Sequence, residues 1–506
     1  MGAIRKGKYS KLGCMECKRR KIKCDESKPV CWHCDRLSKT CVYPARQQKR
    51  DLPNVDLAKS LEELLMDQIG DFQETPASSS LEIPELAITP RIGKFDIGQF
   101  SLDTESRKYL QLFYDEFTQV IFPFNVREEN VIREVILNHA INGGYLLSAV
   151  LACGALRSYH KSSSEADEKS YVGYLSKCMK LLSNRISKGL GDELESMILT
   201  TLLITSYNAS SNVVKWRPHL EAAGRMLMNE NIAGEVYSIC RCWFISIEIL
   251  AGLSSKIGGT ISNEEWKIME GWIEDTSQME NLGLIWKNAW NGPVFNLMYG
   301  YTNKLGVVLG RLCLLLKETR QNGCGCVSIG EIGWLMEMLD SEDIKSFKIW
   351  DGSGYLRKID GIVPAELLES VEEFDDLGDE GGPLWASWWD ISYQSHRIVG
   401  IIQVLTELMQ LPREHLLVRR AIGDAMRILR FLRSGKRVQS YSVLMFQLCV
   451  FLVGKWTCLG EDRVYVVKFF QELRMFGNVS AQHSLDVLES LWSGRRVSDD
   501  EDIISY

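Results

Sequence analysis

Histidine is scarce in this chain, and the histidines present do not cluster. The 506 residues contain seven of them, dispersed along the sequence. The sequence also lacks a phosphate-binding loop, a metal-hydrolase signature and a nucleophile elbow, the usual marks of nucleotide-dependent and hydrolytic enzymes. No group of residues gives a reason to assemble an active site. We therefore expect that the protein is not an enzyme.

Long apolar runs are also missing. A membrane-spanning helix needs about 18 or more apolar residues, whereas the best candidate, Val443 to Gly454, is shorter and contains Gln447. The residues from Met1 to Lys11 are basic without an apolar core, so they do not resemble a secretory signal peptide. We expect a soluble protein of the reducing cell interior with no membrane partner.

Excess positive charge is absent from all but one end of the chain. Residues 1–50 hold 15 Lys or Arg against 4 Asp or Glu, whereas the remaining 456 residues hold 44 basic and 62 acidic side chains. The whole chain carries a net charge of −7. A basic head on an acidic chain indicates a polyanionic partner for that head alone.

Alternating strand-like segments are not seen between Ser106 and Trp492. Apolar residues there recur three and four positions apart, which predicts an all-α domain. Leu220, Ala223, Gly224 and Leu227 share one helical face and should make plain core contacts, with His219 as a cap or packing residue. The clearest helical segments are Leu110–Phe117, Tyr145–Leu156, Tyr171–Ile186, Glu193–Tyr207 and His219–Met228.

Cysteine, by contrast, is plentiful, and six of the fifteen cysteines form a pattern. The gaps between them are two, six, six, two and six residues, at Cys14, Cys17, Cys24, Cys31, Cys34 and Cys41. The other nine are scattered, most of them in apolar surroundings where a reduced thiol behaves as a small hydrophobe. For Cys324 and Cys326 we favour ordinary thiols over a metal or redox pair.

The six-cysteine pattern predicts a metal cluster. Two tetrahedral zinc ions need eight ligand positions, which six thiolates can fill if two of them bridge both metals. A disulfide knot would need an oxidising compartment, and a RING-like scaffold would need eight ligands and a longer central gap, even if His33 were recruited. We therefore favour two zinc ions held by thiolates, with basic neighbours offsetting the negative charge.

Residues Gly13 to Pro44 resemble the fungal binuclear zinc cluster, the two-zinc, six-cysteine DNA-binding domain of fungal transcription regulators. The resemblance joins the cysteine spacing to the basic run Lys18-Arg-Arg-Lys-Ile-Lys23. Within that family, residues 13–43 are most similar to yeast regulators of lysine biosynthesis and, less closely, to sterol-responsive regulators. The resemblance implies that Cys14, Cys17, Cys24 and Cys31 surround one zinc ion and that Cys31, Cys34, Cys41 and Cys14 surround the other. Cys14 and Cys31 would then be the bridging ligands.

The basic run lies where such domains contact double-stranded DNA. We expect Met15 to Lys23 to form a short helix and Trp32 to Lys39 to form the less basic second half. By the resemblance, Arg20 and Lys21 contact bases, which suits CGG-type triplets because both can donate to guanine O6 and N7. Lys18 and Lys23 would contact phosphates, and Arg19 could contact either. A nuclear import signal remains compatible with this run.

The domains are expected at residues 1–50, with the cluster core at 14–41, and at residues 105–495, joined by a linker over 51–104. The linker includes an amphipathic helix at 56–70. In the resembled family a coiled coil at this place pairs two chains, so a homodimer is one reading. Docking of the same helix onto the large domain is the other.

Residues 105–495 resemble the regulatory domain of many fungal regulators. The resemblance rests on Phe113-Tyr-Asp-Glu-Phe117 with Ile121-Phe-Pro-Phe124, on Trp216-Arg-Pro-His-Leu-Glu-Ala-Ala-Gly224, and on Val450-Phe-Leu-Val-Gly454 leading to Glu461-Asp-Arg463. Residues 366–380 and the acidic tail, residues 496–506, mix acidic with apolar residues. That composition is typical of activation segments, although a solvated loop and a frayed terminus explain it equally well.

The sequence thus predicts a nuclear, sequence-specific DNA-binding regulator of RNA polymerase II transcription with two structural zinc ions per chain. It would control metabolic genes and contact the transcription machinery or co-regulators. The alternative is a metabolite or sterol sensor, in which ligand binding to the helical domain controls the DNA-binding output.

Overall fold

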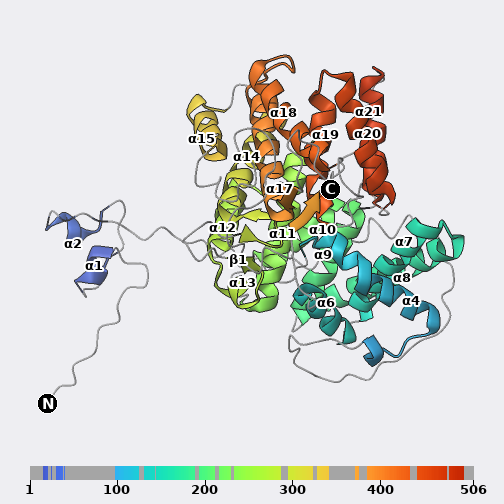
Figure 1. Ribbon diagram of the computed structural model, residues 1–506. Helices are drawn as coiled ribbons and strands as arrows, with labels where there is room; N and C mark the ends of the chain where they lie inside the picture. Colours follow the sequence, from blue (N-terminus) through green and yellow to red (C-terminus); the bar gives the residue numbers. More distant parts are fainter. Residues whose placement is uncertain are drawn as a thin grey trace. The chain divides into compact units, whose positions relative to one another are not determined.

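The computed structural model divides the chain into two compact units, Met1–Asp56 and Leu57–Tyr506. It describes residues 15–20, 24–25, 30–37, 39, 41, 97–124, 130–142, 144–188, 193–210, 216–228, 233–286, 295–322, 327–340, 371–374, 384–432, 441–475 and 478–494. The first unit contains two short helices, α1 (Met15–Arg19) and α2 (Trp32–Asp35) (Figure 1). The helix predicted at 56–70 and the acidic tail at 496–506 lie outside the described residues.

The second unit is helical, as the periodicity predicts. Its amino-terminal part comprises η1 (Ile97–Gln99), α4 (Thr104–Leu112), the π-helical turn η2 (Phe113–Phe117), α5 (Thr118–Ile121), α6 (Val131–Asn142), α7 (Gly144–Ser162), α8 (Glu165–Ile186), α9 (Leu194–Ser210) and α10 (Trp216–Leu227). The middle comprises α11 (Glu235–Ser254), α12 (Asn263–Glu274), α13 (Ser277–Asn281), α14 (Asn303–Asn322) and α15 (Ile329–Asp340). The last part comprises α17 (Trp388–Gln403), the π-helical turn η5 (Val404–Leu408), α18 (Leu416–Leu432), η6 (Tyr441–Phe446), α19 (Gln447–Trp456), α20 (Gly460–Met475) and α21 (Val479–Trp492).

Short strands are the departure from the all-helical pattern. β1 (Ile285–Trp286), β2 (Phe295–Asn296) and β3 (Tyr301–Thr302) form an antiparallel sheet in the order β1-β2-β3. β4 (Val371–Phe374) pairs antiparallel with β5 (Leu384–Ser387), so that Val371 lies opposite Ser387. Pieces of two to four residues are too short to show an alternating pattern in a sequence. The all-α class is confirmed, with these two small sheets added.

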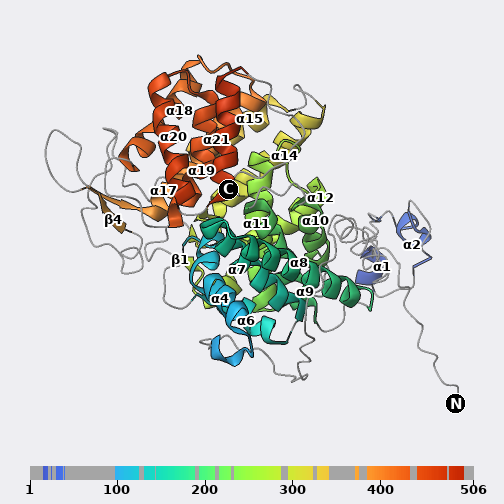
Figure 2. The same ribbon diagram turned by 90° about the vertical axis from the view of Figure 1, so that its right-hand side faces the viewer.

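One continuous apolar core fills the second unit. The helices from α4 to α9 lie at one end and those from α18 to α21 at the other, with α11, α14 and α17 between them (Figures 1 and 2). Phe295 of β2 stacks on Trp389 of α17, with ring centroids 5.0 Å apart. Phe122 meets the ring of Trp243 in α11 edge to face at 5.1 Å. Aromatic pairs of this kind connect segments that are far apart in the chain.

Glycines let helices approach at the predicted small-residue positions. A Cβ added at Gly224 would lie 2.9 Å from the ring of Phe244, so the face of α10 shared by Leu220, Ala223 and Gly224 is a core contact. His219 on the same helix is fully buried, and this burial lowers its pKa to about 4. Its imidazole is therefore neutral at physiological pH, as a packing residue's would be.

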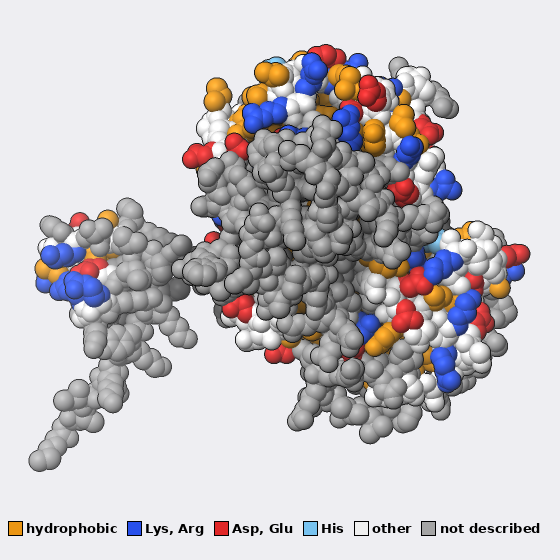
Figure 3. Space-filling view, viewed as in Figure 1, with side chains coloured by type: hydrophobic (Ala, Val, Ile, Leu, Met, Phe, Trp, Pro, Cys, Tyr) orange, Lys and Arg blue, Asp and Glu red, His pale blue; other side chains and the backbone are white. Residues whose placement is uncertain are grey.

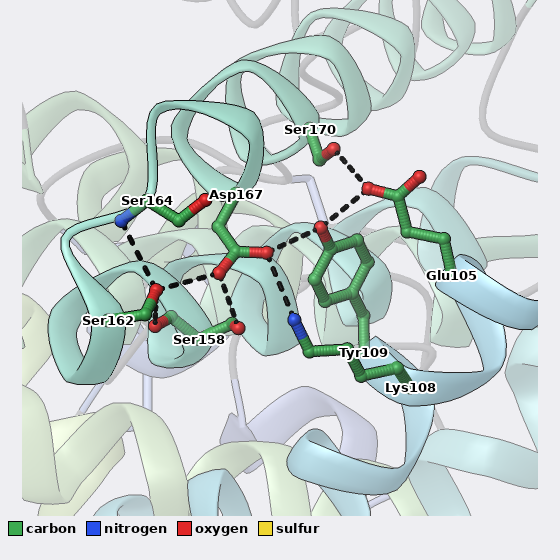
Figure 4. Close-up of polar contacts among 8 residues, drawn as sticks. All are labelled: Glu105, Lys108, Tyr109, Ser158, Ser162, Ser164, Asp167 and Ser170. Atoms are coloured by element: carbon green, nitrogen blue, oxygen red, sulfur yellow. Dashed lines mark hydrogen bonds and ion pairs between the residues drawn. The ribbon is translucent and has the colours of Figure 1, made fainter.

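A buried carboxylate joins three helices at the amino-terminal end of this unit. Asp167, in the first turn of α8, accepts hydrogen bonds from the hydroxyls of Tyr109, Ser158 and Ser162 at 2.7 to 2.9 Å (Figure 4). Lys108 of α4 adds an ion pair at 3.1 Å. Burial alone would raise the pKa of Asp167, but these four donors together lower it to about 2. The carboxylate thus fixes α4 and α7 against the start of α8.

One helix of the core would be long and apolar enough to cross a membrane. It is α11, and 67% of its most apolar window is buried inside the protein. Glu248 in this helix accepts hydrogen bonds from the backbone N–H groups of Thr260 and Ile261. A mostly buried helix with such a satisfied carboxylate is the central helix of a core.

Replacing Gly154 tests the close approach of α7 to α4. A Cβ at Gly154 would lie 2.0 Å from the carbonyl oxygen of Tyr109, and a backbone atom cannot move aside as a side chain can. Gly154→Ala should therefore lower the free energy of unfolding by about 1–3 kcal/mol or more. Gly173→Ala in α8 is the matched control: with no atom within 4 Å, it should raise stability by up to about 1 kcal/mol. Urea unfolding of both variants measures this, and equal effects would contradict it.

Replacing Asp167 tests the carboxylate at the junction of α4, α7 and α8. Because its folded pKa of about 2 lies below the unfolded value of about 3.9, the ionised form stabilises the fold above pH 4. This stabilisation is lost as the pH falls towards 2. Asp167→Asn should cost about 1–3 kcal/mol at pH 7, and the difference from the parent should shrink below pH 4. Asp115→Asn, an exposed carboxylate bonded to Gln111, should cost little.

Candidate metal centre and nucleic-acid interface

Five cysteine thiols make up the buried cluster of the first unit. Cys17, Cys24, Cys31 and Cys34 are at most 3% exposed, and Cys41 packs against them partly buried. Within the described residues none of the five forms a disulfide. In the described part of the unit, no other apolar side chain belongs to this cluster. The sixth predicted ligand, Cys14, lies outside the described residues.

The thiols form two overlapping groups. The sulfur atoms of Cys17, Cys24 and Cys31 lie within 4.8 Å of one another, and so do those of Cys31, Cys34 and Cys41. Cys31 belongs to both groups. This is the arrangement that a bridging thiolate needs, and it agrees with the role that the sequence resemblance gave to Cys31.

The spacing of the sulfur atoms fits tetrahedral zinc. Zinc–thiolate bonds of about 2.3 Å place two ligand sulfurs about 3.8 Å apart. Cys17 Sγ and Cys31 Sγ are 3.6 Å apart. The backbone N–H of Cys31 also points at Cys41 Sγ, 3.3 Å away, where it can stabilise a thiolate. Both the donor type and the spacing suit the metal.

Local backbone structure positions the second pair of thiols. Cys31 is extended at the amino-terminal cap of α2, and its carbonyl accepts from the N–H groups of Cys34 and Asp35 at 3.0 Å. One helical turn therefore brings Cys34 back onto the side of Cys31. Asp25, just after Cys24, accepts from the N–H of Trp32 at 3.2 Å and ties the two halves together.

The described cations of α1 face solvent. Arg19 and Arg20 are both exposed. The guanidinium of Arg19 donates to both carboxylate oxygens of Glu16, at 2.9 and 2.8 Å, and the pKa of Arg19 is raised mainly by this hydrogen bond. Arg20 makes no such side-chain contact within the described residues. The two neighbouring arginines therefore differ in their freedom to reach a ligand.

The remaining predicted DNA contacts are only partly placed. Lys18 lies in α1 but its side chain is outside the described part, and Lys21 and Lys23 are wholly outside it. Figure 3 shows described Lys and Arg side chains at the surface of the first unit.

Two contacts in the first unit were not anticipated from the sequence. One is the pairing of Glu16 with Arg19, which its spacing of three residues on a helix could have suggested. The other is Arg36, whose guanidinium lies 4.9 Å from the centre of the exposed Trp32 ring. Arg36 of the second half therefore already contacts an aromatic ring.

A cavity in the second unit bears on the sensor alternative. It is lined by residues of α11, α12 and α14, among them Glu248, Trp266 and Lys317, and its volume is about 10 Å³. A space of that size holds about one water molecule. This cavity is too small for a sterol or a metabolite.

Comparison with known proteins gives the same division of the chain. Residues 12–50 match the fungal Zn(2)-Cys(6) binuclear cluster domain, and residues 108–504 match the fungal specific transcription factor domain. No solved structure was found to match the chain.

Three curated proteins illustrate the relationship. The lysine biosynthesis regulatory protein of Saccharomyces cerevisiae is 24% identical over 99% of this chain and 81% of its own length. White-opaque regulator 2 of Candida albicans is 41% identical over 49 residues, which are 8% of this chain and 11% of that protein. The transcriptional activator protein UGA3 of Saccharomyces cerevisiae is 61% identical over 36 residues, 7% of each chain. The percentage identity is higher in the two short matches than in the match along nearly the whole chain.

Replacing single cysteines tests which thiol is shared. Cys31→Ser should disturb both metal positions, because its sulfur belongs to both groups, whereas Cys17→Ser should disturb one directly. Cys458→Ser, an exposed thiol of the second unit, is the control and should retain about two zinc ions per chain. Atomic absorption of the dialysed full chain measures zinc. Retention of both ions by Cys31→Ser would contradict the assignment.

Proposed function

The chain belongs to the fungal transcription factors that carry a Zn(2)-Cys(6) binuclear cluster, and from this premise we propose that it recognises CGG-type triplets in nuclear DNA. Members of this family bind DNA and regulate transcription; they are not enzymes. The binuclear cluster domain binds two zinc ions.

The six cysteines at 14, 17, 24, 31, 34 and 41 are proposed as the zinc ligands, with Cys14 and Cys31 as bridges. The two overlapping groups of sulfur atoms support this proposal, since Cys31 is common to both. Zinc supplies no chemistry beyond fixing the chain, because a closed set of thiolates leaves no open coordination position. The residues around it then hold α1 in a fixed orientation.

Arg20 and Lys21 are proposed to contact bases. The observation that carries this part is the exposure of Arg20 at the end of α1, without a side-chain ion pair among the described residues. An arginine can donate two parallel hydrogen bonds to O6 and N7 of guanine in the major groove. Arg20 therefore does not have to break an ion pair with a described residue before it makes these bonds.

Lys18, Arg19 and Lys23 are proposed to contact phosphates. For Arg19 the fork onto Glu16 supports this choice over a base contact, because the Nε and Nη2 edge of its guanidinium already binds the carboxylate. A phosphate could draw the guanidinium away without any requirement for a particular base. These contacts would make binding strongly dependent on salt, since each neutralised phosphate releases counterions.

The proposed domains are the zinc-cluster region 1–50, the linker 51–104, the regulatory domain 105–495 and the acidic tail 496–506. The division of the chain after Asp56 and the start of α4 at Thr104 support these boundaries. We propose that the regulator acts on RNA polymerase II promoters as a homodimer, that the helix predicted at 56–70 pairs the two chains, and that the regulator contacts co-regulators or the transcription machinery.

Metabolic genes are the proposed targets. The support is the lysine biosynthesis regulatory protein of yeast, which aligns with 99% of this chain. Alignment along the regulatory domain as well as the cluster suggests a regulator of the same general kind. Mapping of bound DNA across the genome, read for paired triplets, tests both the targets and the pairing of two chains.

Replacing Arg20 tests base recognition. In the zinc-loaded full chain, Arg20→Ala should lose about 1–3 kcal/mol of discrimination between a site containing CGG and the same site with one guanine changed. The matched control is Arg36→Ala, which removes the same charge from the less basic half. Because Arg36 is not proposed to contact a base, this variant should keep the discrimination between the two sites. Fluorescence anisotropy at several salt concentrations measures both.

Unchanged discrimination by Arg20→Ala would contradict the base contact, whatever the loss in overall affinity. A loss of discrimination by Arg36→Ala as large as that of Arg20→Ala would place recognition in the second half of the cluster. Either result would leave the family membership intact and overturn the assignment of Arg20.

A further inference from the structure

A row of arginines stands out on α18, in the part of the chain that is otherwise acidic. Residues 51–506 hold 62 acidic against 44 basic side chains. Within the 17 residues of α18 the chain has four arginines and a single acid, Asp424. All four arginines, at 419, 420, 427 and 430, are exposed.

Three of these arginines lie on one face. The exposed positions Leu416, Arg420, Gly423, Arg427 and Arg430 follow one another at steps of four, three, four and three residues, which is a single stripe along a helix. A Cβ added at Gly423 would meet no atom within 4 Å, so the middle of the stripe is open. We name this stripe the cationic face of α18.

The cationic face is only partly neutralised by its own surroundings. Arg430 pairs with Asp462 at 3.0 Å, and Arg427 pairs with Asp424 on the same helix. Burial is the main cause that lowers the pKa of Arg427, and the charge of Arg420 lowers it further. Arg419 and Arg420 form no side-chain hydrogen bond or ion pair within the described part of the chain. Their charge is available to an external carboxylate.

The apolar surface at the amino-terminal end of α18 continues this face. Leu416 is 77% exposed and Leu417 is 42% exposed. Figure 3 shows cationic and apolar side chains side by side at the end of the second unit that α18 occupies. A partner that suits this surface carries acidic residues followed by apolar ones.

The acidic tail begins close to the other end of this face. Trp492, in the last turn of α21, donates to the carbonyl oxygen of Gly454 at 2.8 Å and lies under the guanidinium of Arg463 at 5.1 Å. Arg463 follows Asp462, the residue that pairs with Arg430 of α18. The chain therefore leaves α21 beside the start of α20, which contacts the carboxyl-terminal end of the cationic face.

Residues 495–506 are long enough to reach the cationic face, and their acidic and apolar residues occur in the matching order. Packed helices are about 8–10 Å apart, so passing α20 takes roughly 20 Å. The residues from Gly494 to Asp499 or Asp502 span up to about 17 to 28 Å when extended. Arg495 and Arg496 come first, and then Asp499-Asp-Glu-Asp502 is followed by Ile503 and Ile504. Running from Arg430 towards Leu416, the tail would present acids to the arginines and isoleucines to the leucines.

We propose that the cationic face of α18 binds residues 499–506 of the same chain. The four carboxylates pair with Arg420 of this face and with Arg419 beside it, and compete with Asp424 for Arg427, while Ile503 and Ile504 cover Leu416 and the neighbouring Leu417. An acidic and apolar segment held in this way is withheld from other proteins until a competing acidic peptide or high salt releases it. This inference does not depend on the proposed DNA contacts.

Carbodiimide cross-linking in the zinc-loaded full chain tests the contact, because it joins a carboxylate to an amine only when the two touch. Arg420→Lys keeps the positive charge and introduces the amine on the cationic face. The matched control is Arg107→Lys, an exposed arginine on α4 at the opposite end of the second unit (Figures 1 and 2). Mass spectrometry of digested products locates the links, and a mixture of normal and ¹⁵N-labelled chains separates links within a chain from links between chains.

The expected result is a link from position 420 to a peptide containing residues 499–502 of the same chain. Its yield should be several-fold above that of the control and should fall in about 1 M salt, where the Debye length is about 3 Å. A link between a labelled and an unlabelled chain would overturn the proposal in favour of a second copy. A link to residues 366–380 instead, or no excess over the control, would also overturn it.

Discussion

The constraint on which the first unit depends is the shared position of Cys31. Its sulfur belongs to both groups of thiols, and in the described part of that unit the buried cluster consists of cysteines alone. The described part of this unit buries so little apolar side chain that the hydrophobic effect contributes little to its folding. Metal–thiolate bonds take the place of a core, so zinc binding and folding are the same event there. The orientation of α1, and with it the position of Arg20, follows from that event.

The second unit is stabilised in the opposite way, by an extensive apolar core with polar contacts at its edges. Two of its buried carboxylates are well satisfied: Asp167 accepts from four donors, and Glu248 accepts from two backbone N–H groups and a threonine hydroxyl. No metal is needed for such a structure to form. The two units can therefore respond separately to chelation, which would unfold the first and leave the core of the second intact.

Much of this organisation could be predicted because its signals are local. Cysteine spacing identifies the metal centre, and apolar periodicity places the ends of α8 and α10 within one residue, although both helices begin earlier than predicted, α8 at Glu165 and α10 at Trp216. What could not be predicted depends on residues distant in sequence. The segment Leu110–Phe117 reads as one helix but changes to a π-helical turn at Phe113. Asp167 looks like a surface acid until α4 and α7 bring Tyr109 and Ser158 to it.

The two units differ in how many of their positive side chains are paired with carboxylates, and this difference bears on DNA binding. In the second unit most of the partly buried arginines have carboxylate partners, as Arg157 has Glu116 and Arg320 has Glu407. An acidic domain with paired arginines repels the DNA backbone, so attraction to DNA is confined to the first unit. Arg419 and Arg420 of α18 depart from this rule. A carboxylate supplied by the acidic tail would restore it, because it would neutralise the remaining exposed row of positive charge and keep the regulatory domain from competing with α1 for phosphates.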